Sequence, residues 1–258
     1  MARFGKGALA LAAGCVAGVL GAAIVAAGKL PEPAIEPSAE RKARRQLINR
    51  EDMASVYAAK PTGYKIAKRA LDVTLSGAAL VALSPVMVAT ALAIVVEDGR
   101  PVFYSSERPG REMRPFGMLK FRSMYNGADE MLDDLMEGNE QTGAAFKLRD
   151  DPRVTKVGKF IRKYSIDELP QLVNILKGDM SIVGPRAIVP AEEFDIHEIQ
   201  RQLVRPGLTC YWQTMGRTAI PWEEWVELDL DYIQDMSIAT DAKLIAATVP
   251  VVLGGGGE

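Results

Sequence analysis

The sequence contains few of the residues that usually build metal centres, disulfides and histidine triads. Among its 258 residues there are two cysteines, Cys15 and Cys210, and a single histidine, His197. The cysteines lie far apart and no C-x-x-C pair occurs, so we expect neither a zinc site nor a disulfide framework. One histidine cannot supply a site that needs several, and it disfavours a triad. Any catalysis is therefore expected to depend on carboxylate, lysine and arginine side chains.

The chain also lacks an excess of charge of either sign. It carries 31 lysine and arginine residues against 33 aspartate and glutamate residues, which gives a formal net charge of −2. Non-specific nucleic-acid binding needs a basic surface, so this balance predicts no nucleic-acid partner. The length suits one sizeable domain with shorter appendages.

Long apolar runs, by contrast, are present, and the first covers residues 7–28 without a charged side chain. A bilayer crossing takes about 20 residues. Three interpretations are open: a membrane span, a cleaved signal peptide, and a lipoprotein signal that ends at Cys15. We favour a span, because more lysine and arginine residues follow the run than precede it. That bias places the following chain in the cytoplasm.

The second apolar run, residues 73–96, is also free of charge and predicts a membrane helix over 70–97. Ser84 and Pro85 lie at its centre. Proline removes a backbone donor and clashes with the carbonyl four residues earlier, so we expect a kink there. The Ser84 hydroxyl can bond a carbonyl that the proline leaves free. A kinked helix can re-enter and leave by the same membrane face, or it can span; physics alone does not separate these two interpretations.

The helix and strand candidates along the chain indicate an α+β fold that is mainly helical, with a small sheet. We expect an anchor at 1–30, a polar linker with three early prolines at 31–62, and one membrane-associated catalytic domain at 63–258. Within the domain, interfacial amphipathic helices are expected beside the membrane helix. The sequence pattern predicts strands at 101–104 and 116–121, helices at 128–136, 169–176 and 222–234, and an apolar segment at 243–253.

The segment from Ser165 to Pro170 is the most informative for chemistry. Ser165 and Glu168 match the S-x-x-E capping box, but a proline is tolerated only in the first turn, so the helix should begin nearer Asp167. Adjacent residues do not share a helix face, which allows Asp167 and Glu168 different roles. A carboxylate at a helix start is favoured as the anion, which can be a nucleophile or a magnesium ligand. Taken alone, the segment is more simply a helix cap.

Many cations surround this segment in the sequence, and several sit beside glycine or proline. Tight turns of this kind present both guanidinium groups and backbone donors, which suits phosphate binding. Singly, each is more simply a surface charge. The cations are Lys120, Arg122, Arg153, Arg162, Arg186, Arg205 and Arg217.

Taken together over residues 64–253, these features resemble the bacterial sugar transferases, or monotopic phosphoglycosyl transferases. The likeness is closest to the exopolysaccharide galactosyl- and glucosyl-phosphate transferases. The motifs that carry it are K-R-A-L-D-V (68–73), Ser84-Pro85, G-R-P-V-F (99–103), E-R-P-G-R (107–111), K-F-R-S-M (120–124), D-P-R-V-T (151–155), S-I-D-E-L-P-Q (165–171), G-D-M-S-I-V-G-P-R (178–186), R-P-G-L-T (205–209) and W-Q-T-M-G-R (212–217). In the family, the G-R pair that ends the last motif is usually followed by asparagine, whereas Thr218 follows it here. This difference leaves the sugar and nucleotide specificity open.

The resemblance implies a re-entrant helix broken at Ser84-Pro85 and an active site on the cytoplasmic face of the bacterial inner membrane. The implied reaction moves a hexose-1-phosphate from a UDP-sugar to undecaprenyl phosphate and releases UMP. This is the first membrane step of exopolysaccharide, capsule or O-antigen synthesis. Asp167 would be the nucleophile that forms a phosphosugar-aspartyl intermediate, Glu168 would assist, and both would bind Mg²⁺.

The resemblance also implies which cations hold the substrate phosphates and which partners the chain has. The partners are the UDP-sugar, undecaprenyl phosphate, membrane lipid and downstream glycosyltransferases, and the oligomeric state is not predicted. Two alternatives are open: a catalytically inactive assembly factor, which the intact Asp167-Glu168 pair disfavours, and a magnesium-dependent nucleotide-sugar phosphohydrolase. The phosphate-binding residues expected are Lys120, Arg122, Arg162, Arg186 and Arg217.

Overall fold

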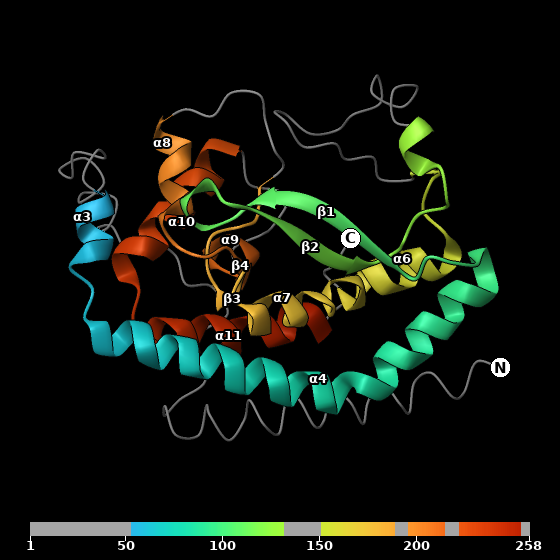
Figure 1. Cartoon of the computed structure of the whole chain (residues 1–258), viewed down its shortest axis with the longest axis horizontal. Helices are drawn as coiled ribbons and strands as arrows, with labels where there is room; N and C mark the ends of the chain where they lie inside the picture. The colour runs from blue at the N-terminus through green and yellow to red at the C-terminus, as the bar shows by residue number, and fades with distance from the viewer. Residues whose placement is uncertain (1–52, 132–150, 189–195, 215–221, 254–258) are drawn as a thin grey trace.

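The computed structural model describes residues 53–131, 151–188, 196–214 and 222–253 (Figure 1). The predicted anchor, most of the predicted linker and Arg217 lie outside the described residues. The described part is mainly helical and contains two small sheets. The α+β class with a small sheet is therefore confirmed at this coarse level.

Helix α4 (Thr62–Asp98) is the longest element and runs along one side of the molecule (Figure 1). It is long and apolar enough to cross a membrane, and only 11% of its most apolar stretch is buried by the rest of the protein. A core helix of a soluble protein would be mostly buried, so the exposed surface of α4 fits membrane association. Its exposed apolar side chains include Ile66, Leu71, Val81, Val88, Leu92 and Val96.

The predicted interruption at Ser84-Pro85 has the expected hydrogen bonding. The helix continues through Pro85 and bends part-way along its length (Figure 1). The carbonyl that Pro85 leaves without a helical donor belongs to Val81, four residues earlier. The Ser84 hydroxyl donates to this carbonyl at 2.8 Å, as the sequence predicts. Whether α4 re-enters the membrane stays a prediction.

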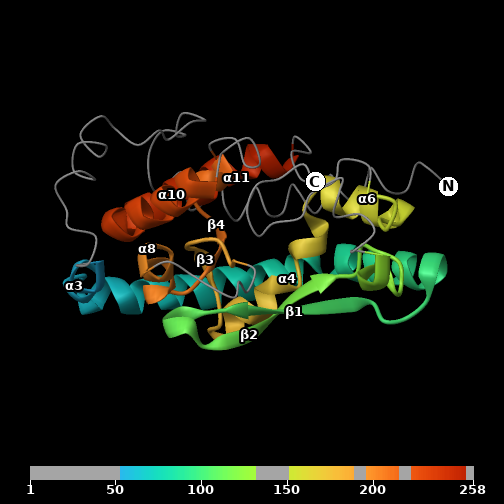
Figure 2. The same ribbon diagram turned by 90° about the horizontal axis from the view of Figure 1, so that it is seen from above.

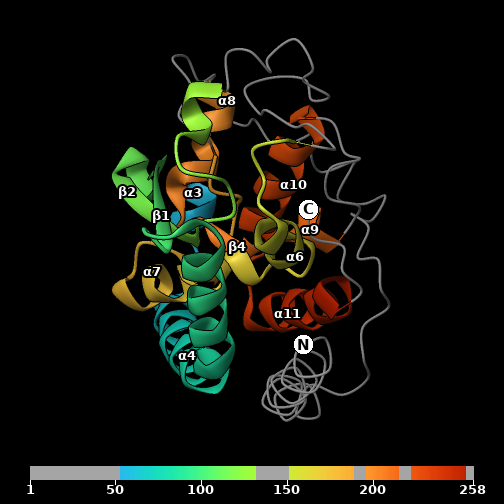
Figure 3. The ribbon, with the colours of Figure 1, turned by 90° about the vertical axis from the view of Figure 1, so that its right-hand side faces the viewer.

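The hairpin of β1 (Phe103–Pro109) and β2 (Pro115–Phe121) is antiparallel and pairs Phe103 with Phe121 at its open end. Strand β2 lies where it is expected, whereas β1 begins later and extends further than the predicted strand at 101–104. Seen from above in Figure 2, the hairpin and the helices α10 and α11 lie on opposite sides of α4, and Figure 3 agrees.

The second sheet pairs β3 (Ser181–Val183) in parallel with β4 (Gly207–Thr209). Just beyond β3, the backbones of Gly184 and Gly207 lie so close that a Cβ on Gly207 would be 2.1 Å from the Gly184 nitrogen. Only glycine fits both positions, and this fixes the path of the chain into Pro185 and Arg186.

The catalytic candidates lie between the hairpin and α4. Helix α6 (Lys156–Lys163) is followed by the 3₁₀ turn η5 (Ile166–Glu168) and by α7 (Gln171–Lys177). Helix α7 packs against α4 and β2, and η5 packs against β2 and α6. The predicted helix at 169–176 is therefore confirmed, with Asp167 and Glu168 just before it.

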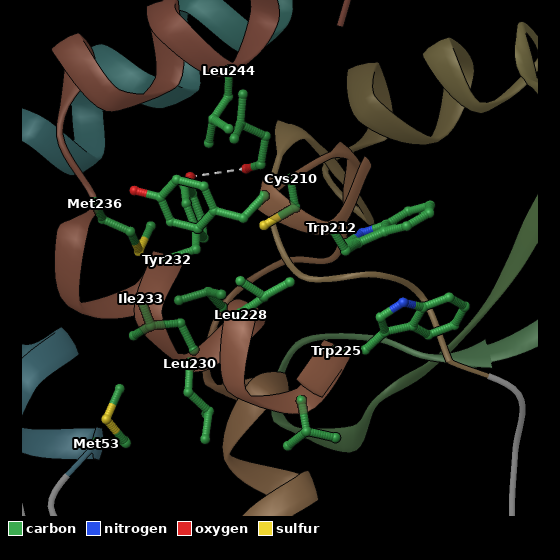
Figure 4. Packing of buried hydrophobic residues seen from close by; sticks show 14 residues of the cluster. Met53, Cys210, Trp212, Trp225, Leu228, Leu230, Tyr232, Ile233, Met236 and Leu244 are labelled. Carbon is green, nitrogen blue, oxygen red and sulfur yellow. Dashed lines mark hydrogen bonds between the residues drawn. The ribbon is translucent and has the colours of Figure 1, made fainter. Parts of the chain in front are cut away.

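The largest hydrophobic core lies around α10 and α11 (Figure 4). Trp212, Trp225, Leu228 and Tyr232 meet there, and Met53 joins them from α3. Helix α3 lies in the segment predicted as a linker, so the end of that segment packs on the domain instead. The surrounding elements are α3 (Met53–Ala58), α8 (Ile196–Ile199), η6 (Gln200–Leu203), α9 (Tyr211–Thr214), α10 (Trp222–Asp235) and α11 (Ile238–Leu253).

Two of the predicted segments differ in extent from the structure. Helix α11 begins five residues before the apolar segment predicted at 243–253, because its first turn contains Thr240 and the buried Asp241, which interrupt the apolar pattern. At the predicted helix 128–136, the described residues form only the 3₁₀ turn η3 (Ala128–Met131). The remaining residues of that prediction lie outside the described part.

The polar start of α4 is joined to three other elements. The Lys68 ammonium lies 3.0 Å from the Asp241 carboxylate of α11 and donates to the Val183 carbonyl of β3 at 2.9 Å. The Asp72 carboxylate accepts from the backbone N–H of Ile182 at 2.9 Å. The Arg69 guanidinium donates to the last carbonyls of α7 at 2.6 and 2.8 Å. Charged side chains therefore fix the beginning of the apolar helix α4 to α11, β3 and α7.

Candidate active site

Asp167, Glu168 and Lys120 meet at the junction of η5 and β2. The Lys120 ammonium donates to the Glu168 carboxylate at 2.9 Å and lies 4.0 Å from the Asp167 carboxylate. Asp167 is 7% exposed, while the side chains of Lys120 and Glu168 are each 27% exposed. One buried carboxylate and one more accessible carboxylate therefore share a single cation.

The capping box expected at Ser165 does not form. Ser165 makes no side-chain capping bond, and its backbone is left-handed, with φ 53° and ψ 25°. Its carbonyl instead accepts the Glu168 N–H at 3.3 Å, which closes the 3₁₀ turn. Because this turn precedes α7, Asp167 lies ahead of the α-helix rather than at its first residue. A left-handed residue other than glycine costs about 1–2 kcal/mol, so packing must hold this turn in place.

The environment of Asp167 differs from the sequence expectation of a readily ionised carboxylate. The pKa of Asp167 is raised to about 6, mainly by burial and also by the neighbouring Glu168 charge. The Lys120 and Arg162 cations lower that pKa, but they do not overcome burial. At neutral pH Asp167 is therefore mainly the anion, and it is more basic than an exposed aspartate.

Arg162, on α6, belongs to the same site. Its guanidinium donates to the Ser123 hydroxyl at 3.0 Å, and its charge acts on Asp167. The hydrogen bond to Ser123, which follows β2, fixes the direction of this long side chain. Among the predicted phosphate-binding cations that lie in the described residues, the charges of Lys120 and Arg162 act on Asp167.

Arg122 has a different set of contacts. Its guanidinium donates to the carbonyls of Asp98 and Gly99 at 3.0 and 2.9 Å, and it also bonds the Asn126 side chain. These carbonyls lie at the C-terminal end of α4, where cations are favoured. Arg122 therefore caps α4, a role that the sequence did not predict.

Arg186 follows β3 and lies in an aromatic setting. Its guanidinium carbon is 4.3 Å from the centre of the Trp212 ring and 5.1 Å from that of Trp225. Its backbone N–H donates to the buried Asp229 carboxylate at 3.2 Å. Stacking on aromatic rings holds a guanidinium in a defined direction.

Two further cations were singled out in the sequence, and both have structural contacts. Arg153 forms a two-pronged pair with Asp151, with distances of 2.9 and 2.7 Å, and both residues are buried. Arg205 donates to the Gly178 carbonyl at the end of α7 at 2.6 Å. These contacts stabilise the turns beside the site rather than the carboxylates themselves.

The comparison with known sequences identifies the family. A sequence profile for the bacterial sugar transferases matches residues 63–255, from the beginning of α4 to the end of α11. This chain belongs to the bacterial sugar transferase family. The match includes Asp167, Glu168 and every cation discussed above, and it leaves residues 1–62 outside.

Several bacterial sugar transferases are similar over most of this chain. It is 47% identical over 196 residues to the galactosyl transferase CpsE of Streptococcus agalactiae, which covers 74% of this chain and 43% of that protein. The exopolysaccharide production protein ExoY of Rhizobium meliloti is 38% identical over 221 residues, with 83% and 96% covered. The undecaprenyl-phosphate galactose phosphotransferase of Salmonella typhimurium is 40% identical over 192 residues, with 72% and 40% covered. The chain therefore spans less than half of CpsE and of the Salmonella protein, and nearly all of ExoY.

In this sugar transferase, Asp167 and Glu168 are the adjacent carboxylates that would hold a magnesium ion together with a substrate. Mg²⁺ is commonly held by one or two carboxylates together with substrate phosphates and water. No group of three or more histidine, cysteine, aspartate or glutamate side chains is placed to hold a metal ion within the described residues. The adjacent pair would supply two carboxylates of an oxygen ligand set, with donor phosphates and water as the remainder.

Arg108 is a further cation near Arg186. In the sequence it was singled out only as part of the E-R-P-G-R motif. Burial lowers the pKa of the Arg108 guanidinium, and the nearby Arg186 charge lowers it further. Arg108 lies on β1 and donates to the Ser106 hydroxyl at 2.7 Å. Its place in the E-R-P-G-R motif was visible in the sequence, but its proximity to Arg186 depends on how the hairpin folds back.

Proposed function

We propose that this chain is a membrane-bound phosphoglycosyl transferase, which moves a hexose-1-phosphate from a UDP-sugar to undecaprenyl phosphate and releases UMP. Family membership supports this, as do the names of relatives. The Salmonella protein is an undecaprenyl-phosphate galactose phosphotransferase, and a Komagataeibacter xylinus relative, 40% identical, is an undecaprenyl-phosphate glucose phosphotransferase. The observation that carries the proposal is the buried Asp167 beside Glu168, with Lys120 between their charges.

In the proposed first step, an Asp167 oxygen attacks the phosphorus atom that carries the sugar. The bond from this phosphorus to the bridging oxygen breaks, UMP leaves with that oxygen, and a phosphosugar-aspartyl intermediate remains. A pKa near 6 suits this step, because the carboxylate is mostly ionised at neutral pH yet retains some basicity. Lys120 and Arg162 reduce the repulsion between the attacking carboxylate and the donor diphosphate.

In the proposed second step, a phosphate oxygen of undecaprenyl phosphate attacks the same phosphorus atom. The bond to the Asp167 oxygen breaks, so the lipid diphosphate sugar forms and the carboxylate is regenerated. Glu168 orients the reacting groups from the more exposed side of the pair. When bound by Asp167 and Glu168, Mg²⁺ would neutralise negative charge on the donor phosphates. Lys120, Arg162 and Arg186 are the proposed phosphate contacts, with Arg217 proposed from the sequence alone.

The proposed location is the cytoplasmic leaflet of the bacterial inner membrane. The exposed apolar surface of α4 supports immersion in lipid, and Pro85 with Ser84 supports a re-entrant path. The acceptor phosphate lies at the headgroup level, so a shallow helix would bring η5 to the depth of this phosphate. The hexose-1-phosphate product on the lipid would begin exopolysaccharide, capsule or O-antigen synthesis and pass to downstream glycosyltransferases.

The test is UMP release by membranes that contain the full chain, with UDP-galactose and UDP-glucose as donors. We expect release that requires undecaprenyl phosphate and that disappears in Asp167→Asn. Cleavage of the donor at the same rate without the lipid acceptor would indicate a phosphohydrolase instead. Absence of any release, in a panel of UDP-sugars and with a protein that inserts and folds, would indicate a catalytically inactive assembly factor.

A further inference from the structure

Asn174 lies on α7 and joins this helix to β2 through its side chain. The carboxamide nitrogen donates to the Gly117 carbonyl at 2.8 Å, and the carboxamide oxygen accepts the Leu119 N–H at 2.9 Å. Asn174 is 1% exposed. Gly117 and Leu119 are two residues apart, so they direct their backbone groups to the same edge of β2. The amide of Asn174 therefore bonds this edge as a third strand would.

Of the two joined elements, β2 carries Lys120, and α7 directly follows the turn η5, which carries Asp167 and Glu168. Lys120 follows Leu119 directly on β2, and α7 begins three residues after Glu168. The Lys120 ammonium lies 2.9 Å from Glu168 and 4.0 Å from Asp167. A shift of β2 along α7 would change both distances, because Lys120 approaches the carboxylates from β2 alone.

We propose that Asn174 is a positioning residue, which fixes β2 against α7 and so sets the distance of Lys120 from Asp167 and Glu168. The proposal rests on the proposed function only for its kinetic consequence. The carboxamide is the group that fits, since it offers one donor and one acceptor at the spacing of two backbone groups. Aspartate loses the donor, and alanine loses both bonds to β2.

The side-chain bonds of Asn174 to β2 differ from the backbone bonds that end α7. The backbone carbonyl of Asn174, not its side chain, accepts the N–H groups of Gly178 and Asp179, each at 3.0 Å. Gly178 is left-handed, with φ 98°, and ends the helix there. The carboxamide nitrogen also donates to the Asp179 carboxylate at 3.2 Å, so Asn174→Ala removes this contact as well as the two with β2. The backbone bonds that end α7 stay intact in this variant, and Asp179→Ala, which removes only the contact between the Asn174 and Asp179 side chains, should retain both cross-links described below.

The test that does not depend on turnover is carbodiimide cross-linking of the full chain in membranes. The reagent activates a carboxylate, a contacting lysine amine forms an amide with it, and the reagent leaves as the urea. Lys120 and Glu168, 2.9 Å apart, should cross-link, and so should Lys68 and Asp241, 3.0 Å apart. We expect Asn174→Ala to lower the first cross-link several-fold, measured by peptide mass spectrometry, and to leave the second unchanged.

Thr248→Val is the matched control, because it also removes a side-chain hydrogen bond between packed elements, at α11, far along the chain from β2. It should retain both cross-links. Equal loss of both cross-links in Asn174→Ala would indicate general loosening and would overturn the proposal, as would retention of both. Where Asn174→Ala does not fold, Asn174→Ser, whose hydroxyl can bond one of the two backbone groups, should give the same selective loss.

Steady-state kinetics distinguish the positioning role of Asn174 from the proposed function of the protein. We expect Asn174→Ala to lower kcat roughly 10- to 100-fold, as a misplaced catalytic group does, with a much smaller change in the KM for the donor. In a Lys120→Met background, Asn174→Ala should lower kcat by less than about twofold, because both changes act through one contact. Additive losses would overturn the positioning role. Absent turnover in the wild type, with the selective cross-link loss present, would refute the proposed function and leave the positioning role intact.

Discussion

The Lys120 ammonium is bonded to Glu168, at 2.9 Å, and lies 4.0 Å from Asp167. The shorter contact is therefore made with the more exposed carboxylate, and the buried one keeps its oxygens less engaged by this cation. A carboxylate oxygen that already accepts a hydrogen bond from Lys120 is less available to attack phosphorus. The geometry thus favours Asp167 as the attacking group and Glu168 as the group that holds Lys120.

The first prediction concerns this division of roles. Asp167→Asn should abolish turnover while the protein still inserts and folds, because the amide keeps the shape of the side chain but lacks the attacking anion. Glu168→Gln should retain residual activity. Intact mass after addition of donor alone should show a phosphosugar adduct in the wild type and none in Asp167→Asn. An adduct that persists in Asp167→Asn would assign the nucleophile to another residue.

The second prediction concerns pH. The pKa of Asp167 is raised to about 6 by burial, and the attacking form is the anion. The rate should therefore rise as pH increases through about 6 and level off above it, in kcat/KM measured from about pH 5 to 8. Arg162→Met removes a cation that lowers this pKa, so it should move the rise to higher pH. Arg114→Met, at a side chain that is 82% exposed on the hairpin, is the control and should leave it in place. A rise displaced to lower pH in Arg162→Met would contradict the assignment.

The third prediction concerns the left-handed Ser165. Ser165→Gly should keep or slightly raise the free energy of unfolding, because glycine adopts this conformation without steric cost. Ser165→Val should lower it by about 1–3 kcal/mol, since a β-branched residue is strained at positive φ. Thermal unfolding in detergent measures both. Ser105→Val, on the exposed extended strand β1, is the matched control and should be nearly neutral. Equal effects of valine at both positions would show that Ser165 is not strained.

The fourth prediction concerns the path of α4 through the membrane. Single cysteines at Lys65 and Arg100, in a chain whose own cysteines are replaced by alanine, should react with an impermeant reagent from the same membrane face. Labelling from opposite faces would establish a span instead. Pro85→Ala restores the N–H that can bond the Val81 carbonyl. It should straighten α4, change the labelling of the Arg100 position and lower activity.

Local chemistry is the part of this structure that the sequence predicts well. The bond from Ser84 to the Val81 carbonyl follows from the spacing of a proline and a serine in a helix, and β2 and α10 follow from short-range patterns. The family motifs also pointed to Asp167 and Glu168. The first three inferences depend on residues within one or two turns of each other, whereas the last depends on motifs along residues 64–253.

The features that the sequence did not predict depend on contacts between distant segments. The pKa of Asp167 is raised mainly by burial against β2 and α6. A position at a helix start favours the anion, so it predicted the wrong direction for this pKa. Arg122 caps α4 because the end of that helix lies beside β2 in the fold. The S-x-x-E pattern predicted a cap at Ser165, but tertiary packing imposed a left-handed turn instead. None of these effects has a local sequence signal.

The attachment of α4 through Lys68, Arg69 and Asp72 has a consequence for hybrid proteins. Each added residue turns a helix by about 100° and lengthens it by 1.5 Å. Inserting one residue between Asp72 and Ser84 would therefore rotate the Ser84–Pro85 bend to another side of the helix, while the charged start stayed fixed to α7, β3 and α11. An apolar segment taken from another protein can replace this one only if it keeps the number of residues between these two points. The bend direction, and not hydrophobicity alone, is what such an exchange must preserve.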